Sequence, residues 1–367
     1  MPKKGDIVYI LGAGVNQCLH DPSGASPPLA RNVFRLALTG RNAPRLETLD
    51  SLEPLFAYIR EKGGPTREGL SKQDFDFEEP LRWLESDEKS NPSDSRVPQV
   101  RSLLGYVLVS TLARYTEHGG GVADATLREL AEIIWRENAT VITFNYDTLI
   151  EDCLRSTSGM RKWNPSDTSG DSIGSNWLPE DGYGVALDRI EHRGFDGRPS
   201  GFRSMPDYPS VEFLKPHGSL NWFRSSSTPV PPPLGPREPG PTSLAPGSLA
   251  LVDGAWGGPV WPALEGYFLN PQIIAGSDEG KAIERSKPPF DAIWRRVGEV
   301  LENCKKVVTI GYSFGDREVA AYVRQHVLAG ALEKLTPVDP SRDTARKIQS
   351  IFGQPNGHFL DSVYLYV

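Results

Sequence analysis

The chain is poor in cysteine. Its 367 residues include three cysteines, Cys18, Cys153 and Cys304, which lie far apart and form no C-x-x-C pair. This spacing excludes a disulfide framework and a zinc site made of four cysteines. Few, widely separated thiols are typical of a reducing compartment, so we expect a cytoplasmic protein.

Long apolar runs and an excess of positive charge are also missing. No apolar run approaches the roughly 18 residues of a membrane helix, and the opening MPKKGDIVYILGAG has too few apolar residues for a secretory signal. Lys and Arg number 40 against 47 Asp and Glu, a net charge of −7. Nucleic-acid-binding surfaces are usually basic, so we expect neither membrane insertion nor direct sequence-specific nucleic-acid binding.

The composition that remains suits a large globular chain. Apolar residues make up 38% of the sequence, enough for an extensive core. At about 150 residues per domain, the length allows two domains or one elaborated domain. The 36 glycines and 32 prolines predict many turns and at least one long loop.

Short β-branched and apolar segments predict strands that are buried on both faces. These segments are 6–11, 140–144, 211–214, 306–310, 334–338 and 362–367. Apolar residues at helical spacing predict helices over 29–38, 46–59, 97–115, 125–135, 288–304 and 317–328. The alternation of strands and helices predicts a doubly wound α/β sheet.

Three segments interrupt this alternation within what we interpret as one domain, residues 1–367. The first is a large helical insertion at 29–138, in which we expect the polar stretch 86–95 to be a solvated loop. The second is an irregular excursion at 156–210, rich in Gly, Pro, Ser and Asp. The third, at 225–248, is a proline-rich mobile loop.

The first predicted strand ends in a glycine turn, Gly12-Ala13-Gly14. Such a turn lets the backbone approach a pyrophosphate, and amides of a following helix donate to it. The G-x-G-x-x-G pattern is not met, because Gln17 stands where the third glycine belongs, and no ribose-binding acid follows about twenty residues later. A tight strand-to-helix turn explains these glycines equally well.

Another predicted strand runs into Thr143, Asn145 and Asp147. Asn145 stands where open α/β sheets place ligand-contacting residues, and its amide can orient a water molecule or a ribose hydroxyl. A tight turn would also explain Asn145, and helix N-capping alone would explain Asp147.

His217 directly follows a predicted strand and precedes a glycine, a setting that the other five histidines lack. Imidazole is the side chain most readily poised as a general base near neutral pH, although a lone histidine in a turn is more often structural. Gly311 and Ser313 follow another predicted strand, and Asp339 follows the next. A carboxylate there can accept from a ribose hydroxyl, and a plain turn at Asp339-Pro340 is the alternative.

The strand ends carry four motifs in the order G-A-G-V-N, T-F-N-Y-D, K-P-H-G and G-Y-S-F-x-D, distributed from Gly12 to Asp316. In combination they resemble the bacterial sirtuin-like family, divergent relatives of the NAD-dependent protein deacetylases found mostly in antiphage defence systems. The resemblance implies a Rossmann-like sheet that binds NAD as a substrate.

The resemblance also divides the site residues among several tasks. The pyrophosphate cradle consists of Gly12, Ala13 and Gly14. The nicotinamide-ribose and catalytic group consists of Asn145, Asp147 and the base His217. The adenosine side is held by Ser313 and Asp339, and the cofactor-binding set also includes Thr143 and Gly311. Asn16 replaces the serine usual in this family at a phosphate or ribose contact.

The zinc-binding cysteines of the deacetylases are absent. We therefore expect no zinc, and hydrolysis of NAD to ADP-ribose and nicotinamide rather than deacylation. The alternatives are an NAD-dependent deacylase or ADP-ribosyltransferase, and a non-catalytic subunit that senses NAD or ADP-ribose.

An unregulated NAD hydrolase would be toxic to its host. The resemblance implies control by assembly or by a partner, so we expect a homo-oligomer and a regulatory partner such as a helicase-like ATPase, with sensing on another chain. The predicted helix at 97–115 is apolar on nearly all sides. It either contributes to contacts between copies or is a core helix.

Overall fold

In the computed structural model of the protein, the described residues are 5–19, 26–39, 50–118, 125–151, 153–154, 188–190, 211–225, 249–252, 263–264, 267–276, 278–287, 289–315, 317–329, 332–339, 346–348 and 350.

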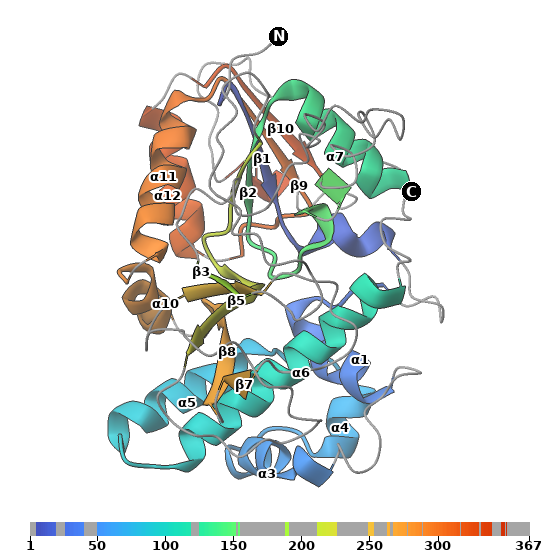
Figure 1. Cartoon of the computed structure of the whole chain (residues 1–367), viewed down its shortest axis with the longest axis vertical. Coiled ribbons are helices and arrows are strands. Elements are labelled where there is room, and N and C mark those ends of the chain that lie inside the picture. Colours follow the sequence, from blue (N-terminus) through green and yellow to red (C-terminus); the bar gives the residue numbers. More distant parts are fainter. Residues whose placement is uncertain are drawn as a thin grey trace, which may run out of the picture.

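The main sheet consists of five parallel strands. They are β1 (Ile7–Leu11), β2 (Thr140–Thr143), β4 (Glu212–Leu214), β9 (Lys306–Ile310) and β10 (Lys334–Val338), in the order β10-β9-β1-β2-β4. In this register Ile10 pairs with Ile142 on one side and with Thr309 on the other. Five of the predicted strands and their parallel arrangement are confirmed (Figure 1).

Helices cover both faces of the main sheet. α7 (Ala125–Glu137) lies on one face, while α11 (Phe290–Asn303) and α12 (Arg317–Ala329) lie on the other (Figure 1). Strands covered on both faces must be apolar on both, and β1 and β2 are buried along nearly their whole length. The doubly wound α/β class is therefore confirmed, together with the helices predicted at these three positions.

The strand order reverses on either side of β1. The chain passes from β1 to β2 and β4 on one side, and β9 and β10 then lie on the other. Numbered along the chain, this is the 3-2-1-4-5 order of Rossmann-type sheets. Such sheets bind ligands outside the carboxyl ends of the strands at the point of reversal, which here lies between the loops after β1 and β9.

A second sheet corrects two expectations from the sequence. Its strands are β3 (Asp188–Ile190), β5 (Gly218–Ser225), β6 (Leu249–Val252), β7 (Ala263–Leu264) and β8 (Tyr267–Ile273), in the order β3-β6-β5-β8-β7. β3 lies inside the excursion 156–210 that we expected to be irregular, and β5, β6, β7 and β8 were not predicted. Segments that adjoin many Gly and Pro residues show little regular alternation. The remainder of 156–210, the predicted loop beyond Ser225 and the predicted strand at 362–367 lie outside the described residues.

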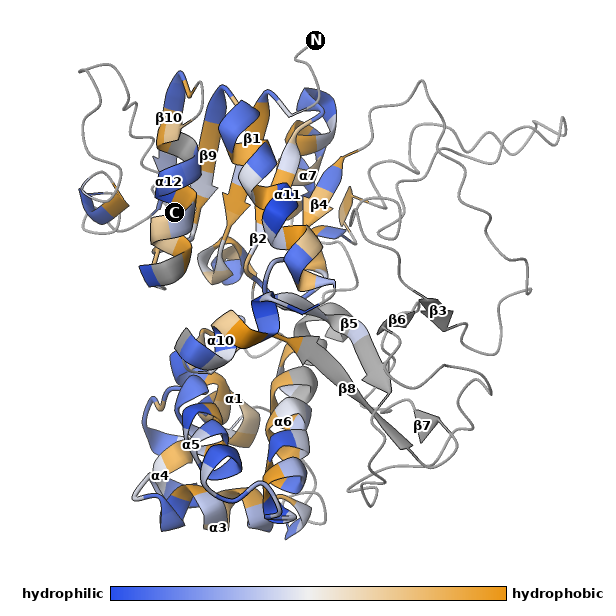
Figure 2. Cartoon of the chain, turned by 90° about the vertical axis from the view of Figure 1, so that its left-hand side faces the viewer, coloured by the Kyte–Doolittle hydropathy of each residue, from blue (hydrophilic) through white to orange (hydrophobic). Residues whose placement is uncertain are grey.

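The helices before α7 pack around a core of their own. They are α1 (Val33–Thr39), α3 (Glu53–Glu61), α4 (Arg67–Lys72), α5 (Glu78–Ser90) and α6 (Arg96–His118). Leu55, Ile59 and Leu104 are fully buried in this helical core, whereas α7 contributes to the core of the main sheet. Figure 2 shows the helical group below the main sheet.

The predicted helices in this group are largely confirmed. α1 and α6 match the predictions at 29–38 and 97–115, and α3 matches the later part of 46–59. The loop expected at 86–95 is wrong in its first half, because α5 continues to Ser90. This last part of α5 is polar and mostly exposed, so its composition resembles that of a loop.

α6 buries its apolar side chains inside its own chain. Those of its described part lie in the helical core and are Val97, Val100, Leu103, Leu104, Tyr106, Val107, Leu108 and Leu112. They are not available for contacts between copies, so the homo-oligomer stays a prediction from the family resemblance. Neither α6 nor any other helix within the described ranges is long and apolar enough to cross a membrane.

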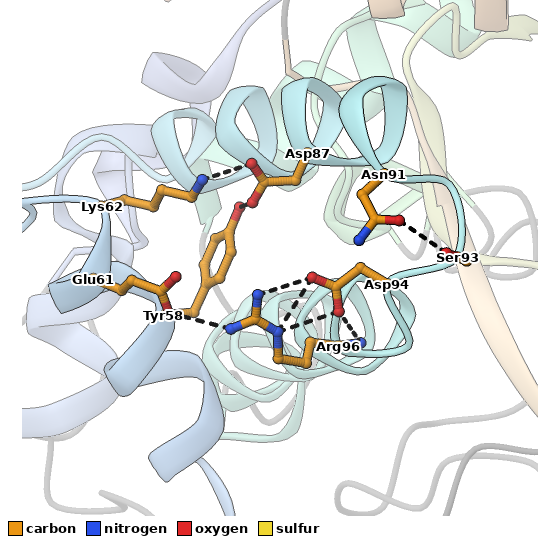
Figure 3. Close-up of polar contacts among 8 residues, drawn as sticks. All are labelled: Tyr58, Glu61, Lys62, Asp87, Asn91, Ser93, Asp94 and Arg96. Carbon is orange, nitrogen blue, oxygen red and sulfur yellow. Dashed lines mark hydrogen bonds and ion pairs between the residues drawn. The ribbon is translucent and has the colours of Figure 1, made fainter.

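Polar contacts tie α3 to α5 and α6 at the edge of the helical core (Figure 3). Asp87 on α5 accepts from Tyr58 Oη at 2.9 Å and from Lys62 Nζ at 2.6 Å. Arg96 at the start of α6 reaches Glu61 Oε2 at 3.3 Å. Exposed pairs of this kind contribute about 0–1 kcal/mol each, so the buried apolar side chains supply most of the stability of this unit.

The helical core is joined to the sheets next to the strand ends. Tyr146, in the loop after β2, donates from Oη to the Ile274 carbonyl at 3.2 Å, and Ala275 packs on the helical core. Lys281 of α10 (Asp278–Arg285) pairs with Glu78 at 3.2 Å. The carboxyl ends of the main-sheet strands therefore face the helical group and the second sheet.

Candidate active site

Four loops leave the carboxyl ends of the main-sheet strands and contact one another. Their described residues are Gly12–Asn16 after β1, Phe144–Asp147 after β2, Lys215–His217 after β4 and Gly311–Gly315 after β9. Each carries one of the four motifs.

The loops after β1 and β9 are locked together through their backbones. Gly12 N donates to the Ile310 carbonyl and Gly14 N to the Gly311 carbonyl, both at 3.0 Å. A Cβ atom on Gly12 would lie 2.6 Å from the Gly311 oxygen, and one on Gly311, whose φ is +60°, would lie 2.3 Å from Val15 N. Only glycine fits this approach. Two amides of the predicted pyrophosphate cradle are thus already used inside the protein.

The segment after the glycine turn is a 3₁₀ helix, Ala13–Cys18, and not the longer helix expected of a dinucleotide site. Ala13 at its start is exposed, while Asn16 in its middle is 3% exposed. This turn can therefore contribute to a ligand site by letting the ligand come close to the backbone at the exposed Ala13.

Asn145 is held against the loop after β1. Its Nδ2 donates to the Gly12 carbonyl at 3.1 Å, and its backbone amide donates to Thr143 Oγ1 at 3.2 Å. This bond fixes the orientation of the amide, and the side chain can offer Oδ1, an acceptor, to a ligand or a water molecule. Thr143 is itself buried and donates to the Leu11 carbonyl at 3.4 Å, so it supports Asn145.

Asp147 performs two tasks inside the protein. Its Oδ1 accepts from the amide of Leu149 at 3.1 Å, where helical residues begin, as a capping side chain does. Its Oδ2 accepts from Asn16 Nδ2 at 2.7 Å. Asp147 therefore orients Asn16, whereas Asn145 is oriented by Gly12. Asn16 Oδ1 is buried and has no hydrogen-bond partner among the described residues.

His217 lies in a tight turn beside an aromatic cluster. Gly218, with φ of +82°, donates from N to the Lys215 carbonyl at 2.9 Å and closes the turn. The His217 ring is 7% exposed and meets the Phe144 ring edge-to-face at 4.9 Å. Phe144 also stacks on Tyr312 at 4.5 Å. One phenyl ring thus contacts residues from both the third and the fourth motif.

A buried ion pair that the sequence analysis did not single out lies beneath Asp147. Lys215 is 0% and Glu151 2% exposed in their side chains, and their Nζ and Oε1 atoms are 2.7 Å apart. Lys215 Nζ also donates to the Asp147 carbonyl at 2.5 Å. Complete burial raises the pKa of both Asp147 and Glu151 above the usual range, and the Lys215 ammonium opposes this rise.

Two signals for this ion pair were present in the sequence. Lys215 belongs to the same K-P-H-G motif as His217, and Glu151 lies four residues after Asp147. A carboxylate four residues along a helix lies on the same face as the first. The sequence did not show that Lys215 pairs with Glu151, because the two residues are 64 positions apart.

The remaining predicted residues lie on the other side of β1. Ser313 is exposed in the loop after β9, and Asp339 is half-buried at the end of β10, the edge strand. Gly311 contributes through its close approach to the β1 loop. The predicted residues therefore form a central group around Asn145 and His217 and a second group along β9 and β10.

Within the described ranges, no three His, Cys, Asp or Glu side chains are grouped so that they could hold a metal ion.

No family model and no curated protein matches the chain. Among solved structures, it is similar to a serine-to-alanine mutant of a Sir2 homologue in complex with ADP-ribose. The TM-score is 0.38 and the identity 13%, over 94% of this chain and 88% of that chain. At this distance the likeness carries no argument, and the fold and the site rest on the topology and contacts above.

Proposed function

We propose that the protein binds NAD at the carboxyl ends of β1, β2 and β9 and hydrolyses the bond between nicotinamide and ribose. The observation that carries the proposal is the convergence of the four motif loops. Asn145, in the loop after β2, bonds the Gly12 carbonyl beside the strand-order reversal of a Rossmann-type sheet, and the His217 ring, in the loop after β4, packs on Phe144 of the same β2 loop. The choice of NAD as the substrate comes from the family resemblance of these motifs.

The hydrogen bonds already made inside the protein determine what the site offers. Asn16 and Asn145 each use one amino hydrogen inside the protein, and their carbonyl oxygens are left as acceptors, of which that of Asn16 is buried. Carbonyl oxygens accept from hydroxyl groups and repel phosphate oxygens. We therefore assign Asn16 to a ribose hydroxyl, and not to the phosphate contact that a serine in its place would allow.

The other predicted residues complete the substrate site. The turn Gly12-Ala13-Gly14 lets the pyrophosphate pass close to the backbone, while Thr143 buttresses Asn145. Gly311, Ser313 and Asp339 lie along β9 and β10, the side assigned to adenosine.

The chemistry requires a base but no acid. Nicotinamide is cationic in NAD and leaves as a neutral molecule, so its departure needs no proton. The transition state at the ribose C1′ atom is oxocarbenium-like. Asn145 Oδ1 accepts a hydrogen bond from the attacking water, and His217 takes the proton that the water loses as its oxygen bonds to C1′. The products are ADP-ribose, nicotinamide and one proton.

The biological setting follows from the family resemblance alone. An NAD hydrolase of this family would deplete NAD during phage infection in the cytoplasm. Its activity would depend on assembly of several copies or on a partner chain such as a helicase-like ATPase.

The test is nicotinamide release from NAD by the purified chain, followed by chromatography. Asn145→Ala and His217→Ala should each lower the rate by at least roughly a hundredfold, the scale of a general base or of the group that orients its water. The matched controls are Asn303→Ala and His326→Ala, because Asn303 bonds Glu299 on α11 and His326 contacts Glu302 from α12, away from the strand ends.

The controls should retain the activity of the unmodified chain, and thermal unfolding should show that all four variants are folded. Release of nicotinamide at an unchanged rate by folded Asn145→Ala and His217→Ala would show that the site is wrongly assigned. Transfer of ADP-ribose to an acceptor, detected in the same reaction by mass spectrometry, would replace hydrolysis with a transferase activity.

A further inference from the structure

We propose that Lys215 is a positioning residue that holds the loop carrying Asn145 and the turn carrying His217 in their reactive arrangement. The inference rests on the proposed function, because the arrangement concerns the water-orienting residue and the base of that reaction. Lys215 itself is buried and takes no part in the chemical step.

Lys215 is connected to both loops, through different parts of the residue. Its side chain reaches the loop after β2, where Nζ donates to the Asp147 carbonyl at 2.5 Å. Its own carbonyl accepts from Gly218 N and closes the turn in which His217 stands. A displacement of this one residue therefore changes the distance between the loop of Asn145 and the ring of His217.

The ammonium is needed for this link because the atom that it holds is a backbone carbonyl. A buried carbonyl requires a donor, and an apolar side chain at position 215 would leave it without the bond from Nζ. Glu151 makes the buried ammonium tolerable, since its carboxylate lies 2.7 Å away and neutralises the charge. The Glu151 carboxylate is thus a counter-ion, and the bond from Lys215 Nζ to the Asp147 carbonyl is the contact that holds the loop after β2 in place.

Other contacts also hold the turn. Trp294 Nε1 donates to the Pro216 carbonyl at 3.1 Å, and Ile274 N donates to the His217 carbonyl at 2.8 Å, which fixes the turn to α11 and to the end of β8. Ser219 Oγ, just beyond the turn, donates to the Tyr146 carbonyl at 3.4 Å, and the His217 ring packs on Phe144. Both contacts reach the loop after β2, but the bond from Lys215 Nζ is shorter, at 2.5 Å, and comes from a charged donor, so it is the strongest of these links.

The test separates the positioning bond from the stability of the ion pair. Lys215→Met alone removes the cation beside a buried carboxylate and is expected to lower stability. Lys215→Met with Glu151→Leu replaces both charges by apolar groups of similar size, which commonly restores stability. Glu151→Gln keeps the lysine and its bond to the Asp147 carbonyl.

We expect the double variant to unfold at nearly the temperature of the unmodified chain and yet to lose roughly a hundredfold in kcat, as a displacement of about 1 Å can cause. KM should change less than about threefold, because the groups proposed to bind NAD remain. Glu151→Gln should keep kcat within about threefold. The matched control is Lys281→Met with Glu78→Leu, a partly buried pair between α10 and α5, which should leave kcat unchanged.

Full kcat in a folded double variant would overturn the proposal. A loss of kcat in Glu151→Gln as large as that in the double variant would also overturn it, because activity would then depend on the Lys215–Glu151 ion pair and not on the bond to the Asp147 carbonyl. If the unmodified chain releases no nicotinamide, the proposed function fails, and the His217 imidazole resonance then tests the positioning separately. Its chemical shift should differ between the unmodified chain and the double variant, while that of His326 should stay the same, and an unchanged His217 shift would refute the inference.

Discussion

Replacing Gly311 by alanine should separate the loops after β1 and β9. Gly311 has φ of +60°, and an added Cβ would lie 2.3 Å from Val15 N and 2.4 Å from the Gly14 carbonyl carbon. These are backbone atoms of a segment fixed by its own hydrogen bonds, so they have no rotamer by which to move aside. The loops must shift.

The size of the effect follows from two contributions. A left-handed φ costs an alanine about 1–2 kcal/mol, and forcing an extra carbon into a packed site costs about 1–3 kcal/mol. Gly63 isolates the first contribution, since its φ is +80° and no atom lies within 4 Å of a Cβ built on it. Gly63→Ala should therefore cost about 1–2 kcal/mol, and Gly311→Ala about 2–5 kcal/mol.

Urea unfolding followed by tryptophan fluorescence measures both free energies of unfolding. The difference between the two variants is the steric cost at the loop contact. In the proposed NAD cleavage assay, Gly311→Ala should also lose activity, while Gly63→Ala, at the end of α3, should retain it. Equal destabilisation by the two substitutions would show that the loops are not in the backbone contact described here.

Three further outcomes are expected. Burial raises the pKa of the Cys304 thiol to about 12, so the unfolded chain ionises it first as pH rises, and stability should fall by about 1–2 kcal/mol between pH 8 and pH 10. Urea unfolding of Cys304→Ala should lack this part of the pH dependence. NAD cleavage should survive EDTA, and metal analysis should find less than one zinc per chain. Light scattering at micromolar concentration should show more than one copy, whereas a fully active monomer would refute control by assembly.

The main sheet could be predicted because its strands are apolar on both faces. Segments such as Ile7–Leu11 lack the alternation of apolar and polar residues that is typical of a strand with one exposed face. Burial between two helical layers requires this apolar composition. β3 was missed because it has only three residues, and β5 because the adjacent Trp222 and Phe223 interrupt the alternation of apolar and polar residues. The end of α5 was missed because its exposed polar residues have the composition of a loop.

The site could be predicted as a set of residues but not as a network. Asn145, Asp147 and His217 were recognisable because each follows a buried strand. Their partners depend on the strand register, which places Ile142 of β2 beside Leu214 of β4 and so brings Lys215 under Asp147. Nothing in the spacing of these segments specifies that register. The bonds from Asn16 to Asp147 and from Asn145 to the Gly12 carbonyl depend on the strand register in the same way.

The hydrogen-bond network also sets the polarity of a ligand at the strand ends. Gly12 and Gly14 donate their amides to the loop after β9, and Asn16 and Asn145 each use one amino hydrogen, on Asp147 and on the Gly12 carbonyl. In the proposed site the Asn145 carbonyl oxygen is left as an acceptor, which suits a ribose hydroxyl or a polarised water. An anion is better accommodated at the exposed start of the 3₁₀ helix. A molecule with a hydroxyl-bearing sugar next to a phosphate matches this division, and NAD has both.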